Sequence, residues 1–236
     1  MDEKRLTFVE HLEELRWRII RVIIFLVAAS AIAYLFSEQI LRLISQPVGD
    51  KLYFFTPTEA FFAKVKIAFY LGGFATIPFL IYQVAGFVFP ALTSEEKKYT
   101  APFVILSTIL FFIGFCFAYF IVLPLGLKFL LSFGGEAMVP LINVNKYLNF
   151  LFWFTIAIGV LFELPLLSFF LAKMGIISPD FLSQRRREAI VILMFIVAVI
   201  TPTVDFATLL IVAIPLIILY EIGIFLARFA APKERS

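Results

Sequence analysis

Long uncharged runs alternate with short charged segments along the chain. The runs cover residues 22–37, 67–94, 99–127, 147–172, 189–204 and 206–227, and only Glu163 and Glu221 interrupt them. A hydrocarbon core of about 30 Å is crossed by about 20 residues of helix, and the longer runs exceed that length. Because the runs are apolar on every side, they do not fit the alternating strands of a membrane barrel. The pattern predicts an all-α, polytopic membrane protein with six transmembrane helices.

The fifth run is shorter than the others. Pro202 interrupts it after residues 189–201, and thirteen residues of helix measure only about 20 Å. We therefore expect spans five and six to be short and to meet in a tight turn at Pro202. Asp205 follows in that turn, where its carboxylate would cap the start of the sixth helix.

The distribution of basic residues predicts the orientation. On an alternating six-span path, fourteen of the twenty lysine and arginine residues fall on the side that holds both termini, and six fall opposite. Both termini are therefore expected in the cytoplasm. Segments 38–66 and 126–146 then face outward, and their turn-forming and apolar residues favour folded periplasmic caps. Residues 1–236 are expected to form a single six-span domain.

Residues 1–21 carry five acidic and five basic residues, which is not the pattern of a cleavable signal. Within them Leu12, Leu15 and Ile19 recur at helical spacing, so we expect a cytoplasmic amphipathic helix that leads into the first span. Glu14 and Arg18 are four residues apart and can form an ion pair on its surface. Such a pair contributes roughly a few tenths of a kcal/mol. Spacing alone favours this structural interpretation.

Composition excludes several function classes. The single histidine, His11, and the single cysteine, Cys116, provide neither a disulfide nor the ligands of a zinc site. The net charge of +3 is modest, and the basic residues of the chain lie at loops and span ends. We therefore expect no nucleic acid as a partner. Because the motifs of proteases, metalloenzymes and P-loop proteins are absent from the sequence, we expect no enzyme, metal or cofactor.

Four acidic residues need an explanation. Glu163 lies deep in the fourth run, where a charge costs about 2.5 to 3.5 kcal/mol on insertion scales, so we expect a functional role, with a helix-bonding carboxyl as the alternative. Glu221 lies near the cytoplasmic end of the last run, where solvent or a basic neighbour can satisfy it. Glu95 and Glu96 lie in a short cytoplasmic loop, where acids at the start of a helix are common.

Seven motifs occur in order along the six runs, and together they resemble the TatC family. They are HLEELR (11–16), PTEAFF (57–62), YQVAGFVFPAL (82–92) followed by EEKK (95–98), FAYF (117–120), FELP (162–165), MGIISP (174–179) and YEIG (220–223). The resemblance covers essentially the whole chain. Any one motif is weakly specific, but all seven in this order are highly specific.

The resemblance implies a protein transport receptor of the twin-arginine (Tat) system. Such a receptor binds the signal peptides of folded cargo proteins on the cytoplasmic face. Matched residue by residue, Glu14 and Glu96 fall where the family contacts the two arginines, while Arg16, Phe87 and Pro47 fall at other functionally sensitive positions. A carboxylate suits this role because a guanidinium can donate two parallel hydrogen bonds to it.

The acidic doublets leave a one-residue ambiguity, since Glu13 precedes Glu14 and Glu95 precedes Glu96. The resemblance further implies TatA- and TatB-type single-span partners, contact with membrane lipid, a homo-oligomeric receptor complex, use of the proton-motive force, and location in the bacterial cell inner membrane. Two alternatives remain. A proton-coupled secondary transporter would use Glu163 to carry a small solute, although no internal repeat supports it. A structural scaffold would tolerate neutralisation of both acidic doublets.

Overall fold

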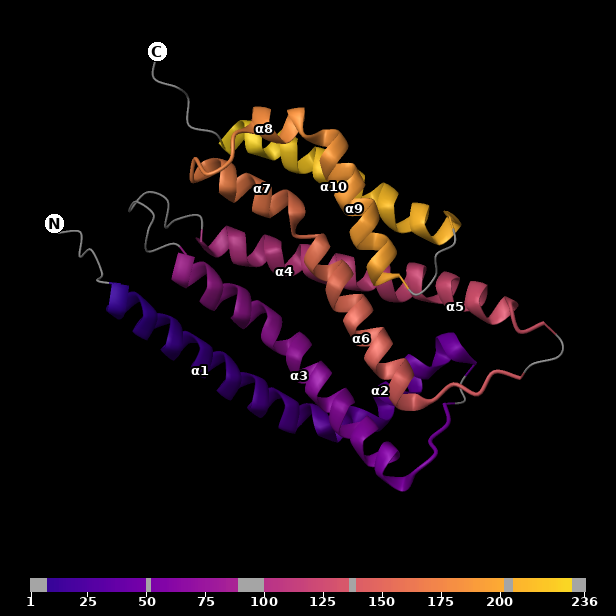
Figure 1. Ribbon diagram of the computed structural model, residues 1–236. Helices are drawn as coiled ribbons and strands as arrows, with labels where there is room; N and C mark the ends of the chain where they lie inside the picture. Colours follow the sequence, from indigo (N-terminus) through magenta and orange to yellow (C-terminus); the bar gives the residue numbers. More distant parts are fainter. Residues whose placement is uncertain (1–7, 50–51, 89–99, 136–138, 202–205, 231–236) are drawn as a thin grey trace, which may run out of the picture. The chain divides into compact units, whose positions relative to one another are not determined.

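The computed structural model describes residues 8–49, 52–88, 100–135, 139–201 and 206–230, and this part of the chain is almost entirely helical (Figure 1). The helices are α1 (Phe8–Ala33), α2 (Ser37–Ser45), α3 (Pro57–Val88), α4 (Thr100–Phe117), α5 (Leu123–Ser132), α6 (Val144–Leu161), α7 (Leu164–Lys173), α8 (Pro179–Gln184), α9 (Arg186–Ile200) and α10 (Phe206–Ala230). Two short 3₁₀ turns, η1 (Tyr34–Phe36) and η2 (Gln46–Val48), flank α2, and a π-helix, η5 (Ala118–Val122), joins α4 to α5.

Five helical stretches within the described residues are long and apolar enough to span a membrane. They are Val9–Val48, Pro57–Phe87, Ala101–Ser132, Val144–Lys173 and Thr208–Ala230. The fifth predicted span corresponds to α9, which has 15 residues and is short, as expected. By contrast, α10 has 25 residues and contains Pro215 in its interior, so the prediction that span six is short is wrong; only span five is short. The turn with Pro202 and Asp205 lies outside the described residues.

Prolines interrupt two of the long spans. Pro165 has no N–H to donate to Leu161, its ring would clash with that carbonyl, and α6 ends at Leu161. Glu163 lies in the resulting break before α7. Pro124 follows η5, where the N–H of Leu123 bonds to the carbonyl of Ala118, five residues back. Such a π turn is a common way to accommodate a residue that breaks the regular ladder.

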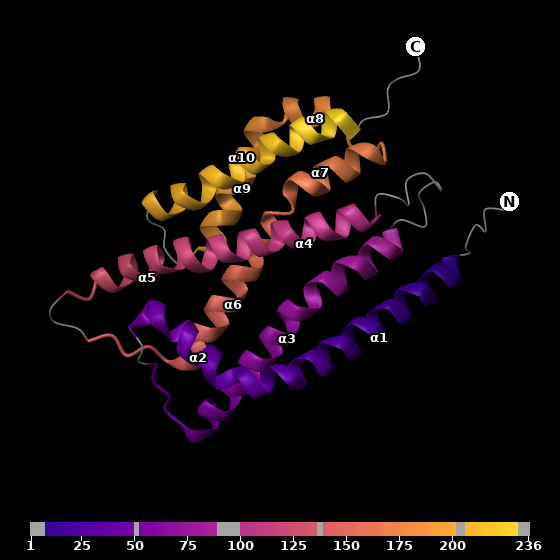
Figure 2. The ribbon, with the colours of Figure 1, turned by 180° about the vertical axis from the view of Figure 1, so that it is seen from behind.

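The chain divides into two compact units. The first comprises residues 1–43 and 56–108, and the second comprises residues 44–55 and 109–236. In the first unit α1 and α3 lie side by side, as Figures 1 and 2 both show. They are tightly packed at Gly72, where an added Cβ would clash with Ser30 Oγ and lie 2.6 Å from the backbone nitrogen of Ser30. Glycine is required at this contact.

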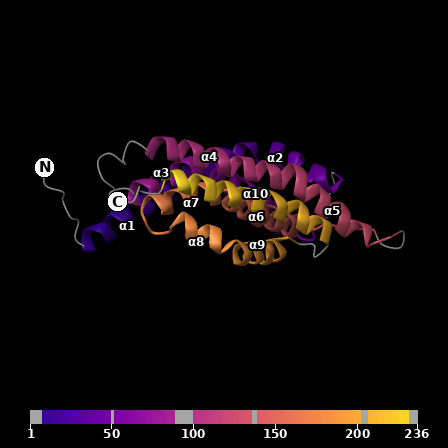
Figure 3. The ribbon, with the colours of Figure 1, turned by 90° about the horizontal axis from the view of Figure 1, so that it is seen from above.

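In the second unit α7 and α10 are neighbours (Figure 3). Gly223 allows this contact, because an added Cβ would lie 2.9 Å from Ser168 Oγ and 3.3 Å from Pro165 Cα. Phe162 packs against Gly114 in the same way. Small residues that let helix backbones approach are the usual solution inside a membrane, where burial of apolar surface does not favour helix association.

The two expected outer caps contain more helix than their composition indicated. Segment 38–66 includes most of α2 and the first ten residues of α3, and segment 126–146 includes the end of α5 and the start of α6. In the second unit the caps are joined, since the N–H of Tyr53 bonds to the carbonyl of Ile142 at 2.9 Å and that of Val144 bonds to Tyr53 at 2.8 Å. Tyr147 also donates to the carbonyl of Ile44 at 2.6 Å. Their periplasmic location stays a prediction.

Candidate functional site

A polar cluster joins the first half of α1 to the last turns of α3. We call it the Glu14 cluster, and it consists of His11, Glu14, Arg18, Gln83, Gly86 and Phe87. Helical spacing places the three residues of α1 on one face. The members from α3 come just before the chain leaves that helix at Val88.

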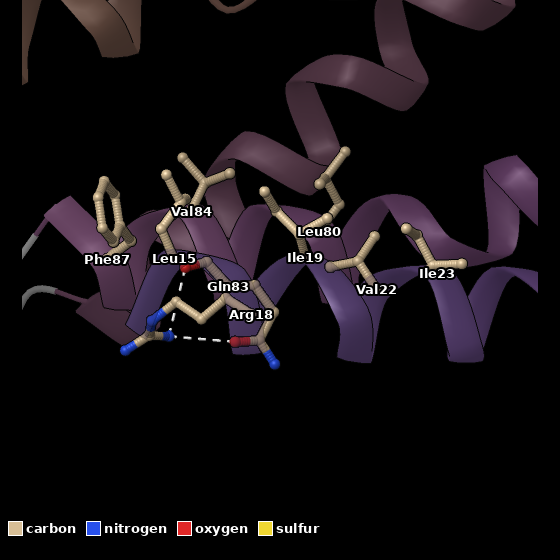
Figure 4. Close-up of a pocket in the computed structure, with 9 residues that line it drawn as sticks. All are labelled: Leu15, Arg18, Ile19, Val22, Ile23, Leu80, Gln83, Val84 and Phe87. Carbon is tan, nitrogen blue, oxygen red and sulfur yellow. Dashed lines mark hydrogen bonds between the residues drawn. The ribbon is translucent and has the colours of Figure 1, made fainter. Parts of the chain in front are cut away.

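Arg18 is the centre of the cluster. Its Nε donates to Glu14 Oε1 at 3.0 Å, and its Nη2 donates to the same oxygen. Nη1 donates to the backbone and side-chain oxygens of Gln83 at 3.3 and 3.1 Å (Figure 4), and Nη2 donates to the carbonyl of Gly86 at 2.8 Å. The side chains of Arg18 and Glu14 are only 18% and 27% exposed. This pair is therefore more than a surface ion pair on one helix.

His11 and Phe87 form the second part of the cluster. Their rings are parallel within 7°, with centroids 4.2 Å apart. His11 Nδ1 lies 4.0 Å from Glu14 Oε2, so this carboxylate oxygen adjoins a pair of stacked rings. An aromatic face next to a carboxylate is a suitable environment for a planar cation.

An apolar groove continues from the cluster between α1 and α3. Its volume is about 200 Å³, and Figure 4 shows its lining. The lining residues are Leu15, Arg18, Ile19, Val22 and Ile23 of α1 and Leu80, Gln83, Val84 and Phe87 of α3. All but Arg18 and Gln83 are apolar, so the groove can take aliphatic side chains or acyl chains.

The structure brings two of the predicted binding residues together and separates others from them. Glu14 and Phe87 both contact His11. Glu13 and Arg16 are exposed on α1. Glu95 and Glu96 lie outside the described residues.

The remaining candidates belong to the second unit. Pro47 is in η2, whose turn ends at Gly49 in the left-handed region with φ 85°. Glu163 is half-buried in the break between α6 and α7, where its carbonyl accepts from Leu167 at 2.9 Å and one carboxylate oxygen is buried. A carboxyl group at a break in a membrane helix is available for polar contacts that a continuous apolar helix does not offer.

A second arginine–glutamate contact lies where α8, α9 and α10 meet, and we call it the Glu221 corner. Arg186 Nε lies 2.9 Å from Glu221 Oε1, and Nη2 lies 3.0 Å from Oε2. Tyr220, the neighbouring residue, donates to the carbonyl of Leu182 at 2.8 Å. Glu221 is thus satisfied by a basic neighbour, one of the two environments that its sequence position indicated.

Sequence reasoning did not identify His11, Gln83 and Gly86 as site residues, and it interpreted Arg18 only as a surface partner of Glu14. The HLEELR and YQVAGF motifs contain the signal, because His11 and Glu14 are three residues apart on one helix face and Gly86 precedes Phe87. Within the described part of the chain, no group of three metal-ligating side chains is placed to hold an ion.

Comparison with known proteins gives a consistent result. Residues 10–215 match the family described as Sec-independent protein translocase protein (TatC). The chain is 41% identical to the TatC protein of Carboxydothermus hydrogenoformans, an alignment that covers 100% of this chain and 98% of the relative. It is 39% identical to the TatC protein of Aquifex aeolicus over 96% of this chain and 97% of that one.

A solved structure also matches. The crystal structure of a protein described as the twin-arginine translocase receptor TatC superimposes with a TM-score of 0.78 and 39% sequence identity. The alignment covers 93% of this chain and 99% of that one. The helix arrangement described above is therefore similar to that of a crystallised membrane protein.

Proposed function

The chain belongs to the TatC family of Sec-independent protein translocase proteins, and we propose that it is the receptor that binds twin-arginine signal peptides. The Glu14 cluster is the binding site, and it lies on the cytoplasmic face of the bacterial inner membrane. The protein carries no reaction centre and acts by recognition. Family membership also favours a translocase component over a secondary transporter of small solutes.

The geometry of Glu14 carries the proposal. Both hydrogen bonds that Arg18 makes to Glu14 go to Oε1, while Oε2 lies 4.0 Å from Nδ1 of His11, whose ring stacks on Phe87. A peptide arginine can donate to Oε2 while its planar guanidinium packs against an aromatic ring. A lysine ammonium carries the same charge but has no planar surface, so it cannot stack flat on the ring while it donates to Oε2.

The second peptide arginine is assigned to Glu96. This residue follows Val88, the end of α3, by eight positions and precedes Thr100, the start of α4, by four. The match of its motif to the family supports this assignment.

The apolar stretch of the signal peptide is assigned to the groove that adjoins the cluster. The groove starts beside Phe87 and extends along α1 past Ile19 toward Ile23. It can take one or two aliphatic side chains that follow the arginines. Glu163 acts at a later step, after the peptide has docked, and a Glu163→Gln variant with normal transport would instead assign it to helix packing.

The receptor works with other components of its system. We assign TatA- and TatB-type single-span subunits as partners, a homo-oligomeric receptor complex, and transport of folded cargo at the expense of the proton-motive force. The exposed apolar residues of the long helices provide the surface that lipid and single-span partners contact.

Binding isotherms of two signal peptides against four proteins test the proposal. One peptide has paired arginines and the other has paired lysines, and the proteins are the parent, Glu14→Gln, Glu96→Gln and the double variant, all in detergent. Loss of a hydrogen bond to a charged group costs about 1.5 to 3 kcal/mol, so each single variant should bind the arginine peptide about 10- to 100-fold more weakly. The preference for arginine over lysine should be smallest in the double variant.

Glu13→Gln is the matched control, because Glu13 is the exposed neighbour of Glu14 and should leave both affinities unchanged. An undiminished arginine preference in the double variant would place the recognition site elsewhere. The two acidic doublets would then be surface ion pairs and helix caps, as a scaffold protein requires.

A further inference from the structure

The guanidinium of Arg18 is fully hydrogen-bonded. A guanidinium has five N–H donors. In the contacts described above, Nε makes one hydrogen bond, and Nη1 and Nη2 make two each. Each N–H therefore has an acceptor, on Glu14, Gln83 or Gly86. Such complete satisfaction is unusual for a side chain on a helix surface and indicates a fixed orientation.

Gly86 makes room for this guanidinium. A Cβ at position 86 would lie 2.5 Å from Arg18 Nη1 and 3.2 Å from both Cζ and Nη2. A methyl group there cannot coexist with the observed position of Arg18, although the helical backbone of Gly86 would otherwise accept alanine. The absence of a side chain at Gly86 is thus a specific adaptation to Arg18.

Arg18 also satisfies a carbonyl of α3, that of Gly86. The usual donor to this carbonyl in a helix would be the N–H four residues further on, and that residue is Pro90, which has no N–H. Arg18 therefore joins α1 to α3 and, through its bonds to Oε1, fixes the carboxylate of Glu14.

We propose that Arg18 is a positioning residue of the signal-peptide site, a resident guanidinium that occupies Oε1 of Glu14 and holds Oε2 ready for the first peptide arginine. This inference rests on the proposed function. Two guanidinium groups then share one carboxylate, each on its own oxygen. Among the described residues no other donor hydrogen-bonds either carboxylate oxygen of Glu14.

Fixed geometry gives the site its selectivity. A carboxylate that can rotate freely presents either oxygen to an ammonium group as readily as to a guanidinium. A carboxylate held by Arg18 presents one oxygen beside the rings of His11 and Phe87, where only a planar group can both donate and stack. Arg18 thus contributes to the discrimination of arginine from lysine without its guanidinium contacting the peptide arginine.

Two variants test this role in the full-length protein in detergent. Arg18→Lys keeps the charge but loses the planar set of donors, and Gly86→Ala keeps Arg18 but fills the space that it occupies. Each should weaken binding of a twin-arginine peptide by about tenfold, as expected for one lost charge-assisted hydrogen bond. Binding of a twin-lysine peptide should change by less than about threefold, so that the arginine preference shrinks.

Arg186→Lys is the matched control, because it makes the same replacement in the arginine–glutamate contact of the Glu221 corner and should change neither affinity. Thermal melting of each variant without peptide identifies any that fails to fold, and Gly86→Ala then serves as the milder variant. Tighter arginine-peptide binding in Arg18→Lys would make Arg18 a competitor and overturn the inference. An unchanged arginine preference in both folded variants would also overturn it, by reducing Arg18 to a structural link.

The outcome is separable from that of the proposed function. If Glu14→Gln loses the arginine preference while Arg18→Lys and Gly86→Ala keep it, the positioning role alone fails. If Glu14→Gln and Glu96→Gln keep the preference as well, the proposed binding site fails.

Discussion

Two of the arginine–glutamate contacts among the described residues, Arg18 with Glu14 and Arg186 with Glu221, differ in geometry and in environment. In the Glu221 corner, Arg186 uses two nitrogens for the two oxygens of one carboxylate, and both side chains are nearly half exposed, at 46% and 45%. In the Glu14 cluster, Arg18 uses one oxygen of Glu14 and backbone carbonyls of α3, and its side chain is 18% exposed. The Glu221 corner has the better two-to-two hydrogen-bond geometry, whereas the paired side chains of the Glu14 cluster are less exposed to solvent.

This difference indicates different roles. An exposed ion pair contributes about 0 to 1 kcal/mol because water solvates both partners and salt screens them. Both oxygens of its carboxylate already accept from Arg186. The cluster is more costly to break, and it leaves Oε2 of Glu14 available. The corner therefore fits a structural contact, whereas the proposed binding site is the cluster, in which Arg18 engages only one oxygen of Glu14.

The largest expected effect comes from the helix contact on which the cluster depends. Gly72→Ala places a methyl group against the backbone of Ser30 and should lower the free energy of unfolding by about 3 kcal/mol, the upper part of the usual cost of overpacking. Unfolding in detergent measures it. Gly73→Ala is the matched control, because nothing lies within 4 Å of a Cβ added there. Equal losses in the two variants would contradict the close approach of α1 and α3.

Removal of Arg18 should have the next largest effect. Arg18→Ala deprives Glu14 and the end of α3 of their shared donor, and we expect a loss of about 2 kcal/mol in the free energy of unfolding. The loss should persist at 1 M salt because the group is mostly buried. A salt-sensitive loss below about 0.5 kcal/mol would place this contact in the class of exposed ion pairs.

A smaller effect is expected from the hydroxyl of Tyr220, which is 8% exposed and donates to Leu182. Tyr220→Phe removes the donor and keeps the ring, so the free energy of unfolding should fall by about 1 kcal/mol. This uncharged bond, rather than the fork beside it, is expected to hold the Glu221 corner together. Stability equal to that of the parent would show that the corner does not need it.

The smallest effect is expected from the fork itself. Arg186→Ala should change the free energy of unfolding by less than about 0.5 kcal/mol at 0.15 M salt, and by less still at 1 M. Measured beside Arg18→Ala under the same conditions, it completes the comparison. If Arg186→Ala costs as much as Arg18→Ala, exposure does not determine the strength of these two contacts.

Much of the fold could be predicted from the sequence because it depends on local properties. The apolar runs predicted the long helices, and Pro202 predicted the shortness of α9. The i,i+4 spacing predicted the pair of Glu14 and Arg18, since both lie on one helix. The break at Glu163 could also be predicted, because Pro165 cannot donate a backbone hydrogen bond to Leu161.

The tertiary part of the site could not be predicted. Gln83 and Gly86 lie 65 and 68 residues beyond Arg18, and no spacing rule relates residues that far apart. Sequence alone also does not show that the guanidinium of Arg18 takes up the space that a Cβ at position 86 would need. For the same reason, spacing predicted only a surface ion pair between Glu14 and Arg18, whereas α3 covers part of this pair.

The central claim is that the peptide arginines bind at the Glu14 cluster and not at the Glu221 corner. Photocrosslinking tests it most directly, with a photoreactive phenylalanine analogue placed at Phe87 in one protein and at Phe181 in another. Phe181 is an exposed residue of α8, next to Leu182 in the corner. We predict that a twin-arginine peptide crosslinks at position 87, that the crosslink weakens with paired lysines or in the Glu14→Gln background, and that position 181 gives little product. Equal or stronger crosslinking at position 181 would contradict the account.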